Sequence, residues 1–228
     1  MMMEEVAVKP RDVMPEGART LAARYYTDPS LLKAELDGLF GTMWFYAGRS
    51  EEAQRAGQYF VRELNRHNIV VTRNATGEIR AFHNVCRHRG SAILSAPVKG
   101  QPTLRCPYHN WAYGLDGSLR ATPFWDGNKV ADPKSMDRAS RGLVPIRSGV
   151  WMDVVFVNVS GDAPPLESAM APFAKLSAPY AMERFRLAHY QAGDVPANWK
   201  LTIEAAVENY HEEFVHPSLP ELLNLQNQ

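Results

Sequence analysis

The chain has 228 residues, in which 25 lysine and arginine residues balance 25 aspartate and glutamate residues. This length allows one large domain or two modest ones, each with its own hydrophobic core. The balanced charge gives no electrostatic reason to expect nucleic acid or an anionic membrane surface as a partner, and we expect neither.

Residues 1–42 are predicted to form an arm followed by a helix. Residues 1–22 carry proline, glycine and charge without clear periodicity, which is typical of an arm that crosses another surface. The arm has acidic residues where a secretion signal has basic ones, and it lacks an apolar segment. Asp28 then offers an N-cap, Pro29 suits the first helical position, and apolar residues recur at helical spacing up to Phe40.

Residues 43–142 are predicted to form a small antiparallel β-domain. Short β-type runs follow one another, namely MWFYAG, QYFVREL, NIVVTRN and EIRAFHN. The sequence NATG at 74–77 separates two of these runs as a hairpin turn, and Asp116 with Gly117 marks another turn. We expect the metal-binding loops of this domain to project from its tips.

Four metal-ligating side chains in this domain are the most informative feature of the sequence. Cys86 and His88 form a C-x-H pair, and Cys106 and His109 form a C-x-x-H pair that begins after seventeen intervening residues. Two thiolates and two neutral imidazoles fit a two-iron two-sulfur cluster of the Rieske kind, in which histidines replace two cysteines on one iron. Two ferric ions, two sulfides and two thiolates sum to zero charge, so such a cluster accepts an electron readily.

The same four residue types also occur in structural zinc sites and, by chance, in protein cores that bind no metal. A structural zinc site uses two cysteines and two histidines, but it normally groups like ligands together, whereas here each pair holds one of each. A chance gathering of buried cysteines and core histidines would not need the surrounding glycines and prolines, such as Gly90 and Pro107. The pattern therefore favours the cluster.

The sequences CRHRG at 86–90 and CPYHNWAYGLDG at 106–117 resemble the cluster-binding loops of Rieske non-haem iron oxygenases. The resemblance implies that Cys86 and Cys106 hold the buried iron and that His88 and His109 hold the outer iron. Rieske proteins of respiratory and photosynthetic membrane complexes add a second cysteine pair and a membrane anchor, but this chain has only two cysteines and no run long enough to span a membrane.

The segment NWKLTIEAAVENYHEEFVHP at 198–217 holds a second group of ligands. Its core predicts a helix on which Glu204, Glu208 and His211 share one face. His211 and His216 do not share a face, because five residues advance a helix well past one turn. If both bind one metal, the helix must end or bend between them, and Pro217 makes an ending plausible.

This segment resembles the mononuclear-iron helix of the same oxygenase family. The resemblance implies that His211 and His216 bind a ferrous ion and that Glu208 links this site to the Rieske histidine of a neighbouring subunit. Many members have asparagine where this chain has Ala205, so any polar role of that asparagine is absent. Ring dioxygenases usually have aspartate at the linking position, and Glu208 instead resembles members that act on quaternary amines.

A two-histidine, one-carboxylate iron site needs a third protein ligand. In the family this is an aspartate far downstream, which suggests that the catalytic part of this chain is incomplete. Glu212 and Glu213 are the local alternatives. We favour an incomplete catalytic domain.

The predicted fold class is α+β. A small antiparallel Rieske domain at 43–142 is followed by the first part of a helix-on-sheet catalytic domain at 143–228. The resemblance implies an oxygenase with a Rieske cluster and a mononuclear Fe(II), which takes electrons from a reductase or ferredoxin and uses O2 to hydroxylate or demethylate a small quaternary amine or aromatic substrate, as a ring of three subunits. The alternatives are a Rieske electron-transfer protein and a degenerate subunit without catalytic iron. Free cysteines committed to a cluster suit a reducing compartment, so we expect a cytoplasmic protein.

Overall fold

The structure is a computed structural model that describes residues 17, 19–95, 102–125, 127, 136–186, 188, 189, 191, 193–208 and 211–216. The chain divides into two compact units, which are described separately below. The larger unit is Ala34–Ala192, and the smaller unit combines Met1–Lys33 with Gly193–Gln228. Most of the arm predicted at residues 1–22 lies outside the described residues.

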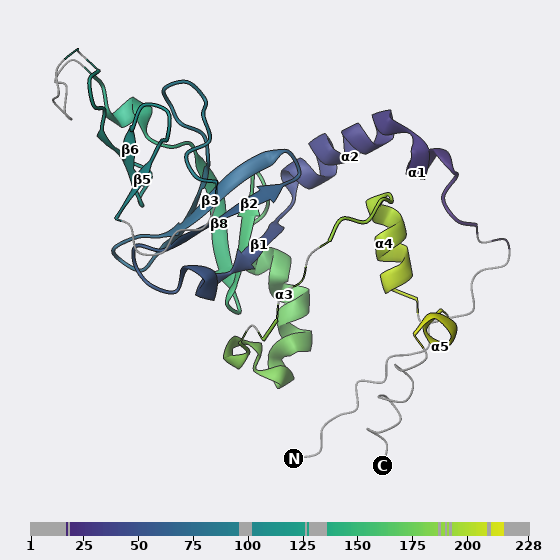
Figure 1. Ribbon diagram of the computed structural model, residues 1–228. Helices are drawn as coiled ribbons and strands as arrows, with labels where there is room; N and C mark the ends of the chain where they lie inside the picture. The colour runs from purple at the N-terminus through teal and green to yellow at the C-terminus, as the bar shows by residue number, and fades with distance from the viewer. Residues whose placement is uncertain are drawn as a thin grey trace. The chain divides into compact units, whose positions relative to one another are not determined.

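Helices and antiparallel strands both occur, as the sequence predicted for an α+β protein (Figure 1). In chain order the elements are α1 (Arg24–Thr27), α2 (Pro29–Thr42), β1 (Phe45–Arg49), η1 (Ser50–Ala53), β2 (Tyr59–Leu64), β3 (His67–Arg73), β4 (Ile79–His83), β5 (Thr103–Arg105), β6 (Ala112–Gly114), β7 (Leu119–Ala121), η2 (Ala139–Arg141), β8 (Pro145–Trp151), β9 (Val154–Asn158), α3 (Leu166–Ser177), η3 (Ala178–Tyr180), η4 (Met182–Arg184), α4 (Trp199–Ala206) and α5 (Glu212–Val215).

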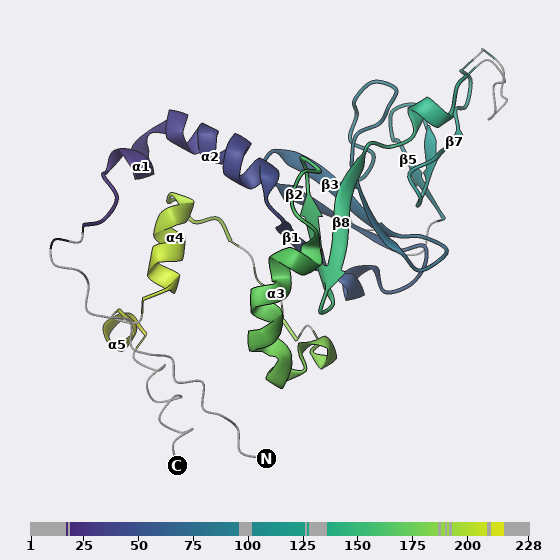
Figure 2. The same ribbon diagram turned by 180° about the vertical axis from the view of Figure 1, so that it is seen from behind.

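The larger unit contains two antiparallel sheets, seen from opposite sides in Figures 1 and 2. The six-stranded sheet has the order β1-β9-β8-β4-β3-β2, and the three-stranded sheet has the order β5-β6-β7. Strand β8 pairs with β4 on one side and with β9 on the other. The large sheet therefore continues across residue 142, where the sequence predicted a domain boundary.

The turns and the first helix form as the sequence predicted. Asn74 closes the β3–β4 hairpin, because its side-chain oxygen accepts hydrogen bonds from the main-chain N–H groups of Thr76 and Glu78. Gly117 lies between β6 and β7 with φ +82°, a conformation that favours glycine. The Asp28 carboxylate accepts a 2.8 Å hydrogen bond from the Ser30 N–H at the start of α2, as an N-cap residue does.

The larger unit has two apolar cores with different tasks. One fills the large sheet and includes Phe60, Ile69 and Val155, all at most 1 % exposed. The other lies beneath the predicted cluster loops and contains both cysteines together with aromatic and aliphatic side chains: Tyr59, Val70, Phe82, Cys86, Ile93, Leu104, Cys106, Trp111, Tyr113, Leu115, Leu119 and Leu143. The second core thus forms the base of the predicted metal site.

The single helix predicted for the segment around Glu204, Glu208 and His211 is wrong in its extent. Helix α4 ends at Ala206, and Val207 closes it with N–H bonds to Ile203 and Glu204 carbonyl oxygens. The N–H of His211 donates to the Glu208 carboxylate, whereas in a continuous helix it would donate to a main-chain carbonyl. A side-chain acceptor therefore replaces the helical one, and Glu208 does not share a helix face with Glu204.

Among the described residues, no helix is long and apolar enough to cross a membrane.

Candidate metal centres

Two loops of the larger unit have the same main-chain hydrogen-bond pattern around their cysteines. The N–H of Cys86 donates to the carbonyl of Ser91, and the carbonyl of Cys86 accepts from the N–H of Gly90. In the second loop, Cys106 makes the same two bonds with the carbonyl of Trp111 and the N–H of Asn110. The fifth residue of each loop, Gly90 or Asn110, has a left-handed conformation with φ +73° or +57°. Two loops of equivalent shape thus present one cysteine and one histidine each.

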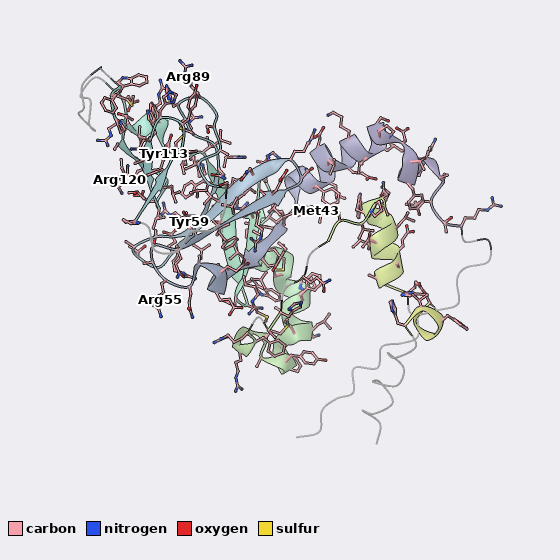
Figure 3. The ribbon with its side chains drawn as sticks, viewed as in Figure 1. Met43, Arg55, Tyr59, Arg89, Tyr113 and Arg120 are labelled. Atoms are coloured by element: carbon pink, nitrogen blue, oxygen red, sulfur yellow. The ribbon has the colours of Figure 1, made fainter. Side chains whose placement is uncertain are left out.

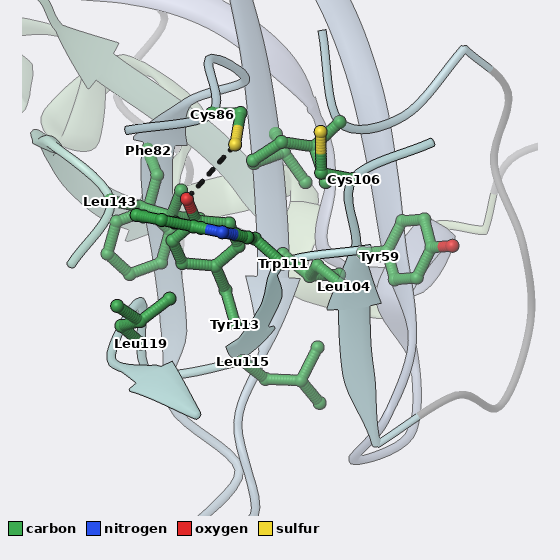
Figure 4. Packing of buried hydrophobic residues seen from close by; sticks show 12 residues of the cluster. Tyr59, Phe82, Cys86, Leu104, Cys106, Trp111, Tyr113, Leu115, Leu119 and Leu143 are labelled. Carbon is green, nitrogen blue, oxygen red and sulfur yellow. Dashed lines mark hydrogen bonds between the residues drawn. The ribbon is translucent and has the colours of Figure 1, made fainter. Parts of the chain in front are cut away.

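The two sulfur atoms lie at the buried end of the site. Cys86 and Cys106 are 3 % and 2 % exposed, and neither forms a disulfide. The hydroxyl of Tyr113 lies 3.2 Å from the Cys86 sulfur and accepts a 3.0 Å hydrogen bond from the N–H of Arg87 (Figure 4). Figure 3 shows Arg89, in the first loop, at the end of the unit opposite Arg55.

The two imidazoles lie nearer to the surface than the two sulfur atoms. The ring centroids of His88 and His109 are 4.5 Å apart, His88 is half-buried and His109 is exposed. His88 is stacked on the buried indole of Trp111, at 4.8 Å and 9° between the ring planes, while Trp125 packs edge-on against both rings. Aromatic walls therefore fix the orientation of His88.

One nitrogen of this site has no hydrogen-bond partner. The Nδ1 atom of His88 is buried without a donor or acceptor to pair with. An unpaired buried polar atom costs about 1 to 3 kcal/mol, so a native structure needs a reason to keep one. Coordination of a metal ion by Nδ1 would supply that reason.

The protonation of the site also suits a metal. Burial raises the pKa of the Cys86 thiol, although hydrogen bonds from Tyr113 and the main-chain N–H of His88 oppose the shift. A buried thiolate thus needs a positive partner, and metal ions are such partners. Burial, with the charges of His109 and nearby arginines, lowers the pKa of His88 and favours the neutral imidazole that binds metals.

These residues fit a two-iron two-sulfur cluster. Within the described part of the chain, no three His, Cys, Asp or Glu side chains converge on one ion position. A Rieske cluster requires no such convergence, because each of its irons takes only two protein ligands and two sulfides. Buried sulfurs and outward imidazoles are the arrangement expected if Cys86 and Cys106 hold the inner iron and His88 and His109 the outer one, an assignment that stays a prediction.

The smaller unit brings the other predicted ligands together. His211 precedes α5 and His216 follows it, and their ring centroids are 5.6 Å apart. A single helical turn therefore allows the two imidazoles to approach, and α5 ends before His216 as a shared metal requires. The Glu208 carboxylate accepts a hydrogen bond from Nδ1 of His211 and a second bond from the His211 N–H at 3.3 Å.

The third ligand of a mononuclear iron is not identified among the described residues. The side chains of Glu212 and Glu213, the local alternatives, lie outside the described part of the structure, as does Pro217. His211 and His216 fit two positions of an iron site, since two imidazoles with a carboxylate on the ring of one of them are a common metal-binding arrangement.

Sequence reasoning missed Tyr113, Trp125 and Tyr26. Tyr113 follows the second cysteine by seven residues and is fully buried, and a buried tyrosine hydroxyl normally has a partner. That rule would have identified Tyr113 as a residue of the site. Tyr26 forms hydrogen bonds with Asn198 and Glu204 of the α4 segment. Nothing in the sequence connects Tyr26 with α4, or Trp125 with His88, because these contacts arise from tertiary folding.

Two family models match the chain. Residues 43–132 match a Rieske [2Fe-2S] domain, and residues 182–228 match the catalytic domain of ring-hydroxylating α-subunits. The two matched regions contain the cysteine–histidine loops and the histidine pair respectively.

Curated relatives and solved structures agree with these matches. The chain is 32 % identical over 205 residues to the carnitine monooxygenase oxygenase subunit of Escherichia coli K12, covering 89 % of this chain and 54 % of that protein. It is 33 % identical over 204 residues to the glycine betaine monooxygenase oxygenase subunit of Chromohalobacter salexigens, covering 90 % of this chain and 44 % of that protein. The chain therefore spans about half the length of the curated relatives it matches.

The solved structures that share this fold include two oxygenases. The quaternary ammonium Rieske monooxygenase CntA in complex with L-carnitine gives a TM-score of 0.78 at 30 % identity, over 87 % of this chain and 55 % of that one. Naphthalene 1,2-dioxygenase from Rhodococcus sp. gives a TM-score of 0.75 at 28 % identity, over 86 % of this chain and 45 % of that one.

Proposed function

Because the chain belongs to the family of Rieske non-haem iron oxygenase α-subunits, we propose that it serves an oxygenase that hydroxylates or demethylates a quaternary amine. The observation that supports this proposal most directly is the presence of two different metal-binding arrangements in one chain. An electron-transfer protein needs only the cysteine–histidine loops, whereas this chain also has the pair His211 and His216 with Glu208 on one ring.

The role of each site follows from its ligands. When bound, the Rieske cluster supplies a one-electron store and the ferrous ion supplies a site where dioxygen is activated. Cys86, Cys106, His88 and His109 hold the former, and His211 and His216 hold two positions of the latter. His109 is exposed, so an electron donor can approach the outer edge of the cluster site.

Glu208 orients a ligand and offers a link between sites. An ionised carboxylate only accepts hydrogen bonds, so Nδ1 of His211 carries the proton and Nε2 remains available for iron. The second half of the proposed role is contact with the Rieske histidine of a neighbouring subunit in a ring of three. One of the CntA structures concerns inter-subunit electron transfer, which supports this part of the proposal for a relative.

A quaternary ammonium compound is the substrate class that we propose. The curated relatives named above are a carnitine and a glycine betaine monooxygenase subunit, and Glu208 stands where aromatic-ring dioxygenases usually have aspartate. Hydroxylation of an N-methyl carbon by O2, two electrons and two protons forms water and an N-hydroxymethyl group. Loss of formaldehyde and a proton from that group leaves a tertiary amine.

The electron donor that we propose is a separate reductase or ferredoxin, and the location is the cytoplasm. Both cysteines are free, and cysteines that bind a cluster must stay reduced, as they do in the cytoplasm.

Iron and acid-labile sulfide per chain, measured in anaerobically purified protein, test the proposal. With a carboxylate ligand that completes the mononuclear site, three irons and two sulfides per chain are expected, with formaldehyde released from glycine betaine or carnitine in the presence of O2 and a reductant. Two irons and no oxidation would instead identify a Rieske electron-transfer protein or a degenerate subunit.

A further inference from the structure

Tyr26 contacts both ends of helix α4. Its main-chain carbonyl accepts a 3.2 Å hydrogen bond from the side-chain amide of Asn198, the N-cap of α4. Its hydroxyl donates a 2.8 Å hydrogen bond to the carboxylate of Glu204, in the last turn of the same helix. Tyr26 and both partners belong to the smaller unit, and Figure 1 labels the helices α1 and α4 of that unit.

The spacing of these two contacts matches the length of the helix. Asn198 and Glu204 are six residues apart, which corresponds to about 9 Å along a helix axis. One tyrosine, through its carbonyl at one end and its hydroxyl at the other, therefore spans most of α4. Asn198 has two tasks at once, because its side-chain oxygen accepts the N–H of Lys200 while its amide donates to Tyr26.

Helix α4 has reason to depend on such contacts. It has eight residues, and a helix of that length is marginal by itself in water. Leu201 and Ile203, in the helix, are 45 % and 54 % exposed, and Val207, directly after it, is 76 % exposed. Burial of these three side chains contributes little to holding the helix in place, which leaves a larger share to the hydrogen bonds of Tyr26.

The clamped end of α4 leads directly to the predicted iron ligands. Glu204 lies in the last turn of the helix. The main-chain carbonyls of Ile203 and Glu204 accept the N–H of Val207, which ends the helix. Glu208 follows immediately and bonds to both the ring and the N–H of His211. A rotation of the last turn of α4 would thus move Glu208 relative to His211.

We propose that Tyr26 is a positioning residue for the Glu208–His211 pair, acting through the two ends of α4. This inference rests on the proposed function, since it concerns electron delivery to the iron bound by His211 and His216. The Tyr26 hydroxyl is suited to the task, because its hydrogen bond to Glu204 raises the pKa of Tyr26 and keeps the phenol protonated.

Tyr26→Phe is the principal test, because it removes the hydroxyl and keeps the ring and the carbonyl. The cluster is reduced chemically, the protein is mixed with O2 and glycine betaine, and reoxidation of the cluster is followed by electron paramagnetic resonance in a single turnover. We expect the reoxidation rate to fall about tenfold, the lower end of the roughly 10- to 100-fold loss seen when groups behind a metal ligand are changed, because Tyr26 acts on Glu208 only through helix α4. In a second measurement, nitric oxide is bound to the ferrous site, and the electron paramagnetic resonance signal of that complex should change shape.

Tyr25→Phe is the matched control. The neighbouring Tyr25 hydroxyl accepts a 3.4 Å hydrogen bond from Arg24, within α1. Its loss should leave the reoxidation rate within about twofold of the wild-type rate. Asn198→Asp is a second variant that separates capping from clamping, because aspartate also caps helices but cannot donate an amide N–H to Tyr26. We expect this variant to be slowed like Tyr26→Phe.

The outcomes distinguish the two proposals. A wild-type protein with only two irons and no nitric oxide signal overturns both the proposed function and the role of Tyr26. Three irons with Tyr26→Phe at the wild-type rate and an unchanged nitric oxide signal overturns only the role of Tyr26. If Tyr26→Phe loses helix stability without any change in rate or signal, Tyr26 has only a structural role, and the proposed positioning role is overturned.

Discussion

Tyr113→Phe is expected to lower the reduction potential of the Rieske cluster. The substitution removes a hydroxyl that lies 3.2 Å from the Cys86 sulfur and leaves the buried ring in place. A sulfur that binds iron has no proton, so the hydroxyl must donate to it and accept the N–H of Arg87. Burial raises the pKa of Tyr113, and the hydrogen bond to Cys86 raises it further, so the hydroxyl stays protonated at neutral pH.

The magnitude follows from the charge of the two redox states. The reduced cluster carries one more negative charge, so a donor at its sulfur stabilises that state more than the oxidised one. A hydrogen bond to a charged group contributes about 1.5 to 3 kcal/mol, of which we assign about 1 to 2 kcal/mol to the difference between the states. At 59 mV per tenfold change in the equilibrium for one electron, the potential should fall by about 40 to 90 mV.

A redox titration followed by electron paramagnetic resonance of the reduced cluster measures this shift. Tyr59→Phe is the control, because Tyr59 is buried in the same core but its hydroxyl points away from the two sulfur atoms in Figure 4. It should leave the potential unchanged. An intact cluster in Tyr113→Phe with a potential equal to that of the wild type would refute the reasoning.

Four further changes test other parts of the structure. Cys86→Ser should abolish the visible absorption of the cluster, and a Rieske resonance signal in that variant would contradict the ligand assignment. Glu208→Gln should keep three irons per chain but stop turnover, as measured by iron content and formaldehyde release; normal turnover would remove its linking role. Gly117→Ala should destabilise the larger unit by about 2 to 4 kcal/mol in denaturant unfolding, because φ is +82° and the new methyl group would collide with Phe82; an unchanged midpoint would be inconsistent with this packing. Burial, with the charge of a nearby histidine, lowers the pKa of His83 below 6.5, so the unfolded chain binds a proton first and stability falls as pH drops below about 6.5. His83→Gln should lose part of that pH dependence in unfolding curves at about pH 7.5 and 5.5, and parallel curves for both proteins would argue against it.

The sequence determined the family, the fold class and the candidate ligands. The family comparisons confirm the resemblance read from the two motifs. Ligand chemistry is a property of residue type and spacing, so Cys86, His88, Cys106 and His109 are recognisable before any folding is known. The turns at Asn74 and Gly117 were predictable for a similar reason, because each depends on the local chemistry of one or two residues.

Tertiary structure decided how these residues meet. The stacking of His88 on Trp111 and the bond between Tyr113 and Cys86 join residues that are distant in the chain. Strand β8 pairs with β4 and extends the large sheet past residue 142. The sequence of a strand does not show which other strand it pairs with, so this continuity was not predicted.

The segment around Glu208 shows the limit of local reasoning most clearly. Helix propensity predicted one continuous helix, but propensities are weak beside a specific hydrogen bond, and the Glu208 carboxylate takes the N–H of His211. Tyr26, far away in the sequence, reaches both ends of the helix that precedes this turn. Residue types thus indicated which side chains are candidate metal ligands, whereas contacts between distant segments decided where those side chains lie, since only folding brings such partners within hydrogen-bonding distance.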